Sequence, residues 1–282
     1  MRAVVLGPDG EPELAEIPEP DGPGELVRVL ACGLCGSDVE KLGDPGRAGG
    51  VLGHEVVARL GDGRRVALVH HCCCGECVQC RAGHESLCGS FAASTIRPGG
   101  FAERARADAW VELPAGIDDA RGTMAEPLAC VLRGAERVPR GRIIVVGHGF
   151  VGHLFAWVLR RRGDEVFVAD ADPRRDGPRP DGEVDAAVLA GGGGVETSIG
   201  TVRPGGTIVV FADAGSIPAA PLYRRELTVT GVRSSTPAHM HEAAALLPEL
   251  DLPAPVVLPL ERFQEGLELF RRRDALKVVL AP

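Results

Sequence analysis

Short alternations of apolar and polar residues dominate the chain up to about Leu113. Six such runs, separated by glycine and proline, predict strands: RAVVL, ELVRVLA, EVVARL, RRVALVH, FAERARA and WVEL. Successive side chains of a strand point to opposite faces, so this pattern is typical of strands with one buried face. The first part of the chain is therefore predicted to be a β-rich unit with inserted loops.

From about Thr123 to Gly231 the pattern changes to apolar strands separated by glycine turns and helical segments. The predicted strands are RIIVVG, EVFVADAD, DAAVLAG, TIVVFA and ELTVTG, and the helix HGFVGHLFAWVLRRRG follows the first of them. Apolar strands in this arrangement predict a parallel sheet covered on both faces.

The last part of the chain predicts two helices and a strand. TPAHMHEAAALLPEL reads as a helix with Ser235 or Thr236 as its N-cap and Pro237 at its first position. The helix LERFQEGLELFRRR and the strand LKVVLA follow.

Composition narrows the class of protein. A net charge of −8 argues against a nucleic-acid partner, because such binding depends on a basic surface. No stretch is apolar enough for a membrane span, and the N-terminus lacks the features of an export signal, so we expect a cytoplasmic protein without a membrane partner. In that compartment nine cysteines indicate metal or catalytic use rather than disulfides.

Four cysteines in the stretch HHCCCGECVQCRAGHESLC have the spacing of a zinc site, C-x2-C-x2-C-x7-C. They are Cys74, Cys77, Cys80 and Cys88. Four thiolates close a tetrahedron around zinc and leave no open coordination position, so such a zinc is structural. The other residues of the stretch are expected to be spare thiols and loop side chains: Cys72, Cys73, His70, His71 and His84.

A second set of possible ligands is sparse. Cys35 follows a predicted strand in ACGLCGSD, and His54 begins the next one in GHEVVA. With a carboxylate they would provide three ligands and an open fourth position, as in catalytic zinc sites.

A glycine-rich turn lies between a predicted strand and a predicted helix, in a G-x-G-x-x-G pattern. It consists of Gly147, Gly149, Phe150, Val151 and Gly152, with His148 between the first two glycines. This pattern in this context favours dinucleotide binding. Asp170, at the end of the next strand, favours NAD over NADP because its charge would repel a 2′-phosphate. Arg174 and Arg175 are positively charged and could bind a 2′-phosphate, so NADP stays an alternative cofactor. Arg175 is a candidate cofactor contact.

Taken in order, CGLCGSD, GHE, the cysteine loop, AEPLA and the glycine turn resemble the zinc-dependent medium-chain dehydrogenase superfamily of alcohol, polyol and threonine dehydrogenases. The resemblance implies an α/β plus β fold, in which a β-rich GroES-like catalytic domain is interrupted by a Rossmann domain. The corresponding boundaries are 1–126 and 232–282 for the GroES-like domain, 127–231 for the Rossmann domain, and about 72–90 for the structural zinc lobe.

The resemblance also implies roles for single residues. Cys35 and His54 match catalytic-zinc ligands, Glu126 in AEPLA matches a glutamate that binds this zinc directly or through water, and Glu55 matches a ligand or supporting carboxylate. Ser37 matches the hydroxyl that takes the alcohol proton. Where relatives often carry a histidine that relays this proton, the chain has Glu40, the candidate substitute.

The chain is also shorter than typical members of the superfamily. Only PRRDGPRPDGEV separates the second and third predicted strands of the Rossmann domain, too little for a helix and a strand. An edge strand and its helix are therefore expected to be missing from this sheet.

The function that this resemblance implies is NAD-dependent oxidation of a secondary alcohol or polyol by a homodimer or homotetramer. It implies two zinc ions per chain, one catalytic and one structural. Two other hypotheses are consistent with the sequence: an amino-alcohol dehydrogenase of the threonine type, and a non-catalytic, zinc-stabilised nucleotide-binding protein.

Overall fold

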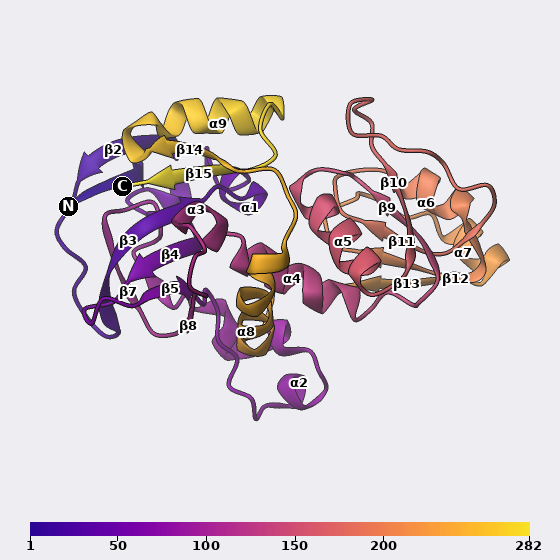
Figure 1. Cartoon of the computed structure of the whole chain (residues 1–282), viewed down its shortest axis with the longest axis horizontal. Helices are drawn as coiled ribbons and strands as arrows, with labels where there is room; N and C mark the ends of the chain where they lie inside the picture. The colour runs from indigo at the N-terminus through magenta and orange to yellow at the C-terminus, as the bar shows by residue number, and fades with distance from the viewer. The chain divides into compact units, whose positions relative to one another are not determined.

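A computed structural model describes residues 1–282, apart from the side chain of residue 92. The chain divides into two compact units, Met1–Ala129 with Thr236–Pro282, and Cys130–Ser235 (Figure 1). No helix among the described residues is long and apolar enough to cross a bilayer.

The first unit is built on a sheet of eight strands. Its main path is β14 (Val256–Pro259), β15 (Val278–Ala281), β3 (Glu25–Gly33), β4 (Glu55–Arg59), β5 (Arg65–Leu68) and β8 (Trp110–Glu112). β7 (Arg104–Ala107) also pairs with β3, and β6 (Ile96–Arg97) pairs with β7. The neighbours are antiparallel except β14 and β15, and β1 (Arg2–Leu6) and β2 (Pro12–Glu16) form a separate antiparallel pair. The predicted β-rich unit is confirmed.

The helices of this unit are short, apart from three. They are α1 (Gly36–Val39), α2 (Val78–Arg81), α3 (Asp119–Gly122), α4 (Ala125–Ala135, whose last residues enter the second unit), α8 (Pro237–Leu246) and α9 (Phe263–Arg272). Thr236 is the N-cap of α8, where its side chain accepts a hydrogen bond from the backbone of His239. Of the two predicted caps, the structure uses Thr236.

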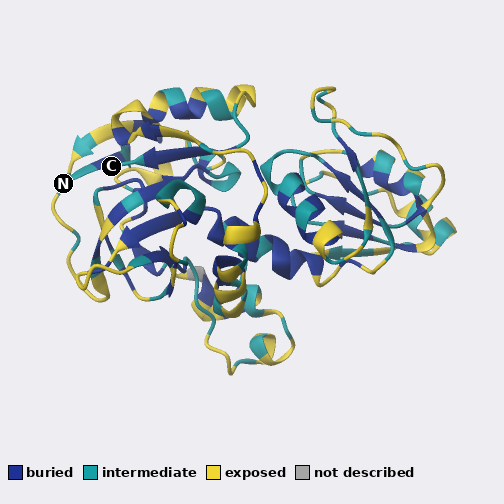
Figure 2. Ribbon diagram, viewed as in Figure 1, coloured by how far each residue is buried: buried dark blue, intermediate teal, exposed yellow. Residues whose placement is uncertain are grey.

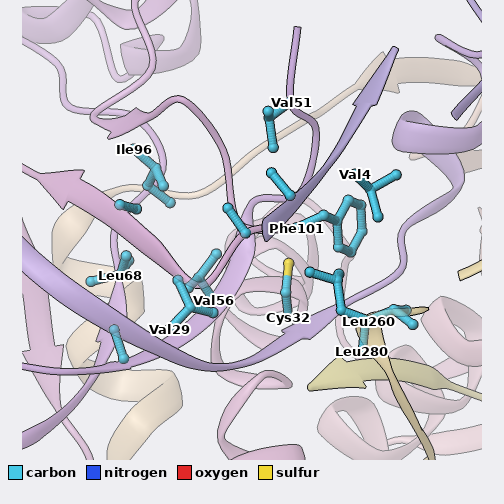
Figure 3. Close-up of a cluster of buried hydrophobic side chains, with 14 of the residues drawn as sticks. Val4, Val29, Cys32, Val51, Val56, Leu68, Ile96, Phe101, Leu260 and Leu280 are labelled. Atoms are coloured by element: carbon cyan, nitrogen blue, oxygen red, sulfur yellow. The ribbon is translucent and has the colours of Figure 1, made fainter. Parts of the chain in front are cut away.

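A large apolar cluster lies inside this unit. Figure 3 shows Val29, Cys32, Val56 and Leu280, which come from three strands, around Phe101. Phe263 of α9 meets Phe101 edge to face, with ring centroids 5.1 Å apart. The final segment of the chain is therefore part of this core, although most of the chain separates it from β3 and β4.

The second unit contains a parallel sheet of five strands. Their order is β10 (Glu165–Ala169), β9 (Arg142–Val146), β11 (Val184–Leu189), β12 (Val202–Val210) and β13 (Thr228–Gly231). The helices are α5 (Phe150–Arg161), α6 (Val195–Thr201) and α7 (Ala219–Arg225). The two strands β9 and β11 are mostly buried, whereas β13 contains no buried residue (Figure 2).

This order is that of a Rossmann sheet without its third strand, as predicted. Residues 171–183 contain neither helix nor strand. The sequence did not predict α6 and α7, which have only seven residues each and contain residues unfavourable to helices, such as Gly200 and Pro221.

We expect Phe101→Ala to lower the free energy of unfolding of the first unit by about 3–5 kcal/mol, because it leaves a cavity beside Phe263. Urea unfolding followed by circular dichroism measures this change. Leu14→Ala is the control, since Leu14 is 46% exposed on β2. An equal loss in both variants would mean that Phe101 is not at the centre of a packed core.

Candidate active site and structural metal centre

Four cysteine thiols meet in the lobe around α2. The sulfur atoms of Cys77 and Cys80 are 3.5 Å apart, those of Cys74 and Cys88 3.6 Å, and those of Cys74 and Cys80 4.0 Å. Zn–S bonds of about 2.3 Å in a tetrahedron put sulfur atoms about 3.8 Å apart. The four thiols therefore fit a zinc ion, and they form one of the two clusters of possible metal ligands among the described residues.

Local backbone geometry supports thiolates in this lobe. Cys77 is the N-cap of α2, and its sulfur accepts a hydrogen bond from the Cys80 backbone. The backbone N–H of Cys74 lowers the pKa of Cys88 to about 6. Desolvation and the hydrogen bond with Cys77 raise the pKa of Cys80 to about 12. Four thiols this close ionise together only with a cation between them, which suits a divalent metal.

The second cluster consists of Cys35, His54 and Glu55, whose possible ligand atoms lie within 4.8 Å of one another. The sheet brings them together, since β3 ends at Gly33, directly opposite Glu55 at the start of β4. Cys35 then caps α1. Two chain segments about twenty residues apart thus provide three donors, with the mixed sulfur, nitrogen and oxygen character of catalytic zinc sites.

Asp38 holds this cluster in place. One of its carboxylate oxygens lies 3.1 Å from Nδ1 of His54 and accepts a hydrogen bond from the Gly53 backbone, and the other accepts from the Cys35 backbone. Nδ1 of His54 therefore faces the carboxylate, and only Nε2 is left for a metal. A carboxylate on the outer nitrogen of a ligand histidine fixes its tautomer and orientation.

His54 and Asp38 are both buried, and each stabilises the charged form of the other. Burial alone lowers the pKa of His54, but the charge and hydrogen bond of Asp38, together with those of Cys35, outweigh it and raise this pKa well above its ordinary value. Burial alone raises the pKa of Asp38, but the charge and hydrogen bond of His54, together with the charge of Lys41 and the Cys35 backbone N–H, lower it overall. The pair thus attracts a positive charge, either a proton on His54 or a cation at Nε2.

Glu55 has a cationic partner, Lys277, which lies immediately before β15. Lys277 forms a buried ion pair with Glu55 and donates a hydrogen bond to the Leu34 carbonyl at 3.1 Å. A Cβ atom on Gly33 would lie 2.0 Å from the Glu55 carboxylate and 2.9 Å from Cε of Lys277. Only glycine at position 33 leaves room for this ion pair.

The other predicted residues of this site lie around the cluster. The Ser37 hydroxyl is 3.6 Å from the Cys35 sulfur. Glu126, in the first turn of α4, is half-buried and outside the three-residue cluster, but its charge acts on Lys277. Glu40 follows α1 and is exposed. The structure thus brings Cys35, His54, Glu55 and Ser37 together, and Glu40 is not part of this group.

A row of stacked rings extends from the candidate site. His54 stacks on His70 at a centroid distance of 4.9 Å, His70 meets His71 at 3.7 Å, and His71 stacks on Phe91 at 4.6 Å. Burial, followed by the charges of His54 and His71, lowers the pKa of His70 to about 2, so that ring is neutral. His70 was predicted to be a loop side chain, and its contact with His54 was not foreseen.

In the second unit, the glycine turn lies at the carboxyl end of β9, beside the loop that follows β11. Gly147 has a φ of +92°, and a Cβ atom there would lie 2.7 Å from the backbone nitrogen of Gly191. A Cβ on Gly152 would lie 2.0 Å from the Gly147 carbonyl oxygen, whereas around Gly149 the nearest atom is 3.8 Å away. The backbone is therefore packed behind the turn and open at Gly149, as the approach of a pyrophosphate requires.

The remaining predicted cofactor residues border this turn. Phe150 and Val151 begin α5, so their backbone N–H groups belong to its first turn. Asp170 follows β10, and its carboxylate accepts hydrogen bonds from the backbones of His148 and Asp172 at 2.6 and 2.8 Å. Nη1 of Arg175 is the atom nearest to the Cβ position of Gly149. The structure thus gathers these residues at the carboxyl ends of β9 and β10.

The sequence reasoning missed Lys277 as part of the site. A signal was present, because only two of the 31 lysine and arginine residues are lysines, and this one lies within the predicted apolar strand LKVVLA. It was not sufficient, since its partner Glu55 is more than two hundred residues away and only the pairing of β15 with β3 brings them together.

A GroES-like β unit and a Rossmann-type parallel sheet in one chain define the fold of the medium-chain dehydrogenases. Comparison with known proteins agrees, since residues 22–115 match the alcohol dehydrogenase GroES-like domain. The chain belongs to the zinc-dependent medium-chain dehydrogenase superfamily, as a shortened member.

The similarity to individual relatives covers most of the chain. The chain is similar to D-altritol 5-dehydrogenase of Agrobacterium fabrum, with 32% identity over 83% of this chain and 84% of the relative. It is 27% identical to L-galactonate-5-dehydrogenase of Escherichia coli K12, over 94% of each chain. Among solved structures, the alcohol dehydrogenase TADH of Thermus sp. ATN1 has a TM-score of 0.84 and 26% identity over all of both chains.

We expect the purified protein to contain two zinc ions per chain and Cys35→Ala to contain one, with an unchanged melting temperature. Cys77→Ala should also lose one zinc but should unfold at lower temperature, because a structural zinc contributes directly to folding free energy. Elemental analysis and calorimetry measure both quantities. One zinc in the wild-type protein, or equal destabilisation by the two variants, would contradict the division of roles.

We expect Lys277→Met to lower the free energy of unfolding by about 3–5 kcal/mol, because it leaves the Glu55 carboxylate buried without a partner. Adding Glu55→Gln should recover part of this loss. Urea unfolding of the single and double variants measures the coupling between the two side chains. If the two losses simply add, the ion pair does not form in solution.

Proposed function

We propose that the protein is a zinc-dependent dehydrogenase that oxidises a secondary alcohol or polyol with NAD. The observation that carries this proposal is the convergence of Cys35, His54 and Glu55 within 4.8 Å, with Asp38 on the outer nitrogen of His54. This donor set with a supporting carboxylate suits a catalytic rather than a structural zinc. A second, mixed-donor cluster besides the four-cysteine lobe favours a catalytic protein over a non-catalytic one.

When bound, zinc would lower the pKa of an alcohol hydroxyl and NAD would accept hydride, which together are the chemistry of alcohol oxidation. Cys35 and His54 would hold the metal, and Glu126 or Glu55 would be its third protein ligand, directly or through water. Lys277 favours Glu126 for this role, because it already neutralises Glu55.

Ser37 would take the alcohol proton. Its hydroxyl is next to the Cys35 sulfur, so a substrate oxygen at the metal would lie within reach of it. From Ser37 the proton would pass to solvent through bound water or through Glu40. The exposed position of Glu40 suits the outer end of such a route.

NAD is preferred over NADP in this proposal because Asp170 puts a negative charge at the end of β10. Its two oxygens each accept one backbone hydrogen bond and can accept a second from a ribose hydroxyl. A 2′-phosphate at the same place would meet an anion.

A polyol or sugar-acid substrate is supported by the names of the relatives. D-altritol and L-galactonate each carry several hydroxyl groups on adjacent carbons. We therefore place the substrate among polyhydroxylated compounds with an oxidisable secondary alcohol.

The test is a panel of polyols, sugar acids, simple alcohols and L-threonine, with NAD and NADP, on zinc-loaded protein. Reduced nicotinamide should form fastest with a polyhydroxylated substrate and NAD. Ser37→Ala should lower kcat by about 10²-fold or more, as expected for loss of a proton-transfer group, and Glu126→Gln should lower both kcat and the content of catalytic zinc.

Glu268→Gln is the matched control, because this exposed glutamate on α9 pairs only loosely with Arg272. It should leave turnover and zinc content unchanged. Preference for L-threonine would favour an amino-alcohol dehydrogenase. Nucleotide binding without turnover of any alcohol in the panel would favour a non-catalytic nucleotide-binding protein.

A further inference from the structure

The segment that replaces the missing strand and helix, residues 171–183, is held by several hydrogen bonds. The backbone of Asp170 donates to the Asp176 carboxylate at 3.0 Å, and that of Arg175 donates to the Asp172 carbonyl at 2.9 Å. A Cβ on Gly177 would lie 2.6 Å from Val168, so the segment passes close against β10. Despite its prolines, it has a defined path.

His148 connects this segment to the glycine turn. Its backbone N–H donates to Asp170, and its Nδ1 lies 2.9 Å from the Arg175 carbonyl oxygen. A carbonyl oxygen only accepts, so Nδ1 carries the proton and donates. Burial, ahead of all other causes, lowers the pKa of His148, so the ring is neutral near pH 7 and this bond uses its one N–H.

A second histidine fixes the ring of His148. His153 of α5 stacks on it with a centroid distance of 3.7 Å and an interplanar angle of 1°. Nδ1 of His153 in turn donates to the carbonyl oxygen of Gly149 at 2.9 Å. The two rings therefore form a rigid link between the glycine turn, the start of α5 and the segment 171–183.

This link determines where the Arg175 side chain lies. Its carbonyl is bound by His148, and its Nη1 reaches to 3.8 Å from the Cβ position of Gly149, the open glycine of the turn. A guanidinium at this place faces the position where the dinucleotide diphosphate approaches the backbone.

We propose that Arg175 binds the diphosphate of the cofactor and that His148 is the positioning residue that holds Arg175 there. This inference rests on the proposed dinucleotide site and specifies it. The segment that shortens the sheet thus supplies a cation to the phosphates, and His148 replaces the support of the missing elements. The diphosphate is common to NAD, NADP and ADP-ribose, so Arg175 does not distinguish between them.

Direct binding tests this proposal without turnover. NADH and NADPH are titrated by fluorescence and ADP-ribose by calorimetry, on the purified zinc-loaded protein. Arg175→Ala should weaken binding of all three by a similar factor, about tenfold, as expected for loss of a charged hydrogen bond. Arg179→Ala, in the same segment, is the control and should change none of them. A loss confined to NADPH would mean that Arg175 recognises a 2′-phosphate and would overturn the proposal.

Variants of His148 test the positioning role. His148→Phe keeps a ring against His153 but has no donor for Arg175, and it should weaken NADH binding nearly as much as Arg175→Ala does. His148→Asn keeps a donor at the same distance from the backbone and should retain most of the affinity. In the His148→Phe background, Arg175→Ala should add less than a twofold loss, because the guanidinium is already displaced.

Independent effects of the two substitutions, or unchanged binding in His148→Phe, would overturn the positioning role. If His148→Phe does not fold, wild-type affinity in Arg175→Ala alone would still overturn the proposal. Failure of the wild-type protein to bind any nucleotide would contradict the cofactor assignment, and this inference with it. Binding that is unaffected by these substitutions would leave the dehydrogenase proposal intact.

Discussion

Two buried carboxylates beside the candidate metal site impose the strongest physical constraint on this fold. Asp38 and Glu55 are each only 1% exposed, and a buried carboxylate without compensation is too unfavourable to persist. Asp38 is compensated by His54 and by backbone N–H groups, and Glu55 by Lys277. Because Lys277 lies in the last segment of the chain, compensation of Glu55 requires β15 to pair with β3.

The same charges explain why the site suits a divalent cation. With Cys35 as thiolate, the site contains the negative charges of Cys35, Asp38 and Glu55. Lys277 balances one of them, and a zinc ion bound by Cys35 and a neutral His54 would balance the other two. The ion pair between Lys277 and Glu55 also affects which residues would bind the metal. Because the Glu55 carboxylate already has a cationic partner, another residue could be the third protein ligand. The carboxylate of Glu126 is a suitable candidate because its charge already acts on Lys277.

Local pattern predicted most of the longer elements and pointed to the four cysteines of the lobe and to Cys35 and His54, which the structure brings together. It did not predict the contacts between distant segments. Alternation identified β3, β4 and β5, and the glycine turn identified the β9 to α5 connection, because both signals depend on neighbouring residues. The pairing of Lys277 with Glu55 and the stacking of His70 on His54 depend on strand register and loop path, which no local pattern encodes. Short elements such as β14 and α7 were missed because tertiary packing, rather than propensity, stabilises them.

The absence of the third Rossmann strand leaves β10 at the edge of the sheet, next to the segment of residues 171–183. Without its outer neighbour, β10 has one unpaired edge, and an exposed edge can pair with another chain. Residues 171–183 pass against β10 at Gly177, and the prolines among them cannot donate hydrogen bonds to a further strand. Because the same residues are tied to the glycine turn through His148 and Asp170, the path of this segment beside β10 and the shape of the proposed cofactor site depend on one set of hydrogen bonds.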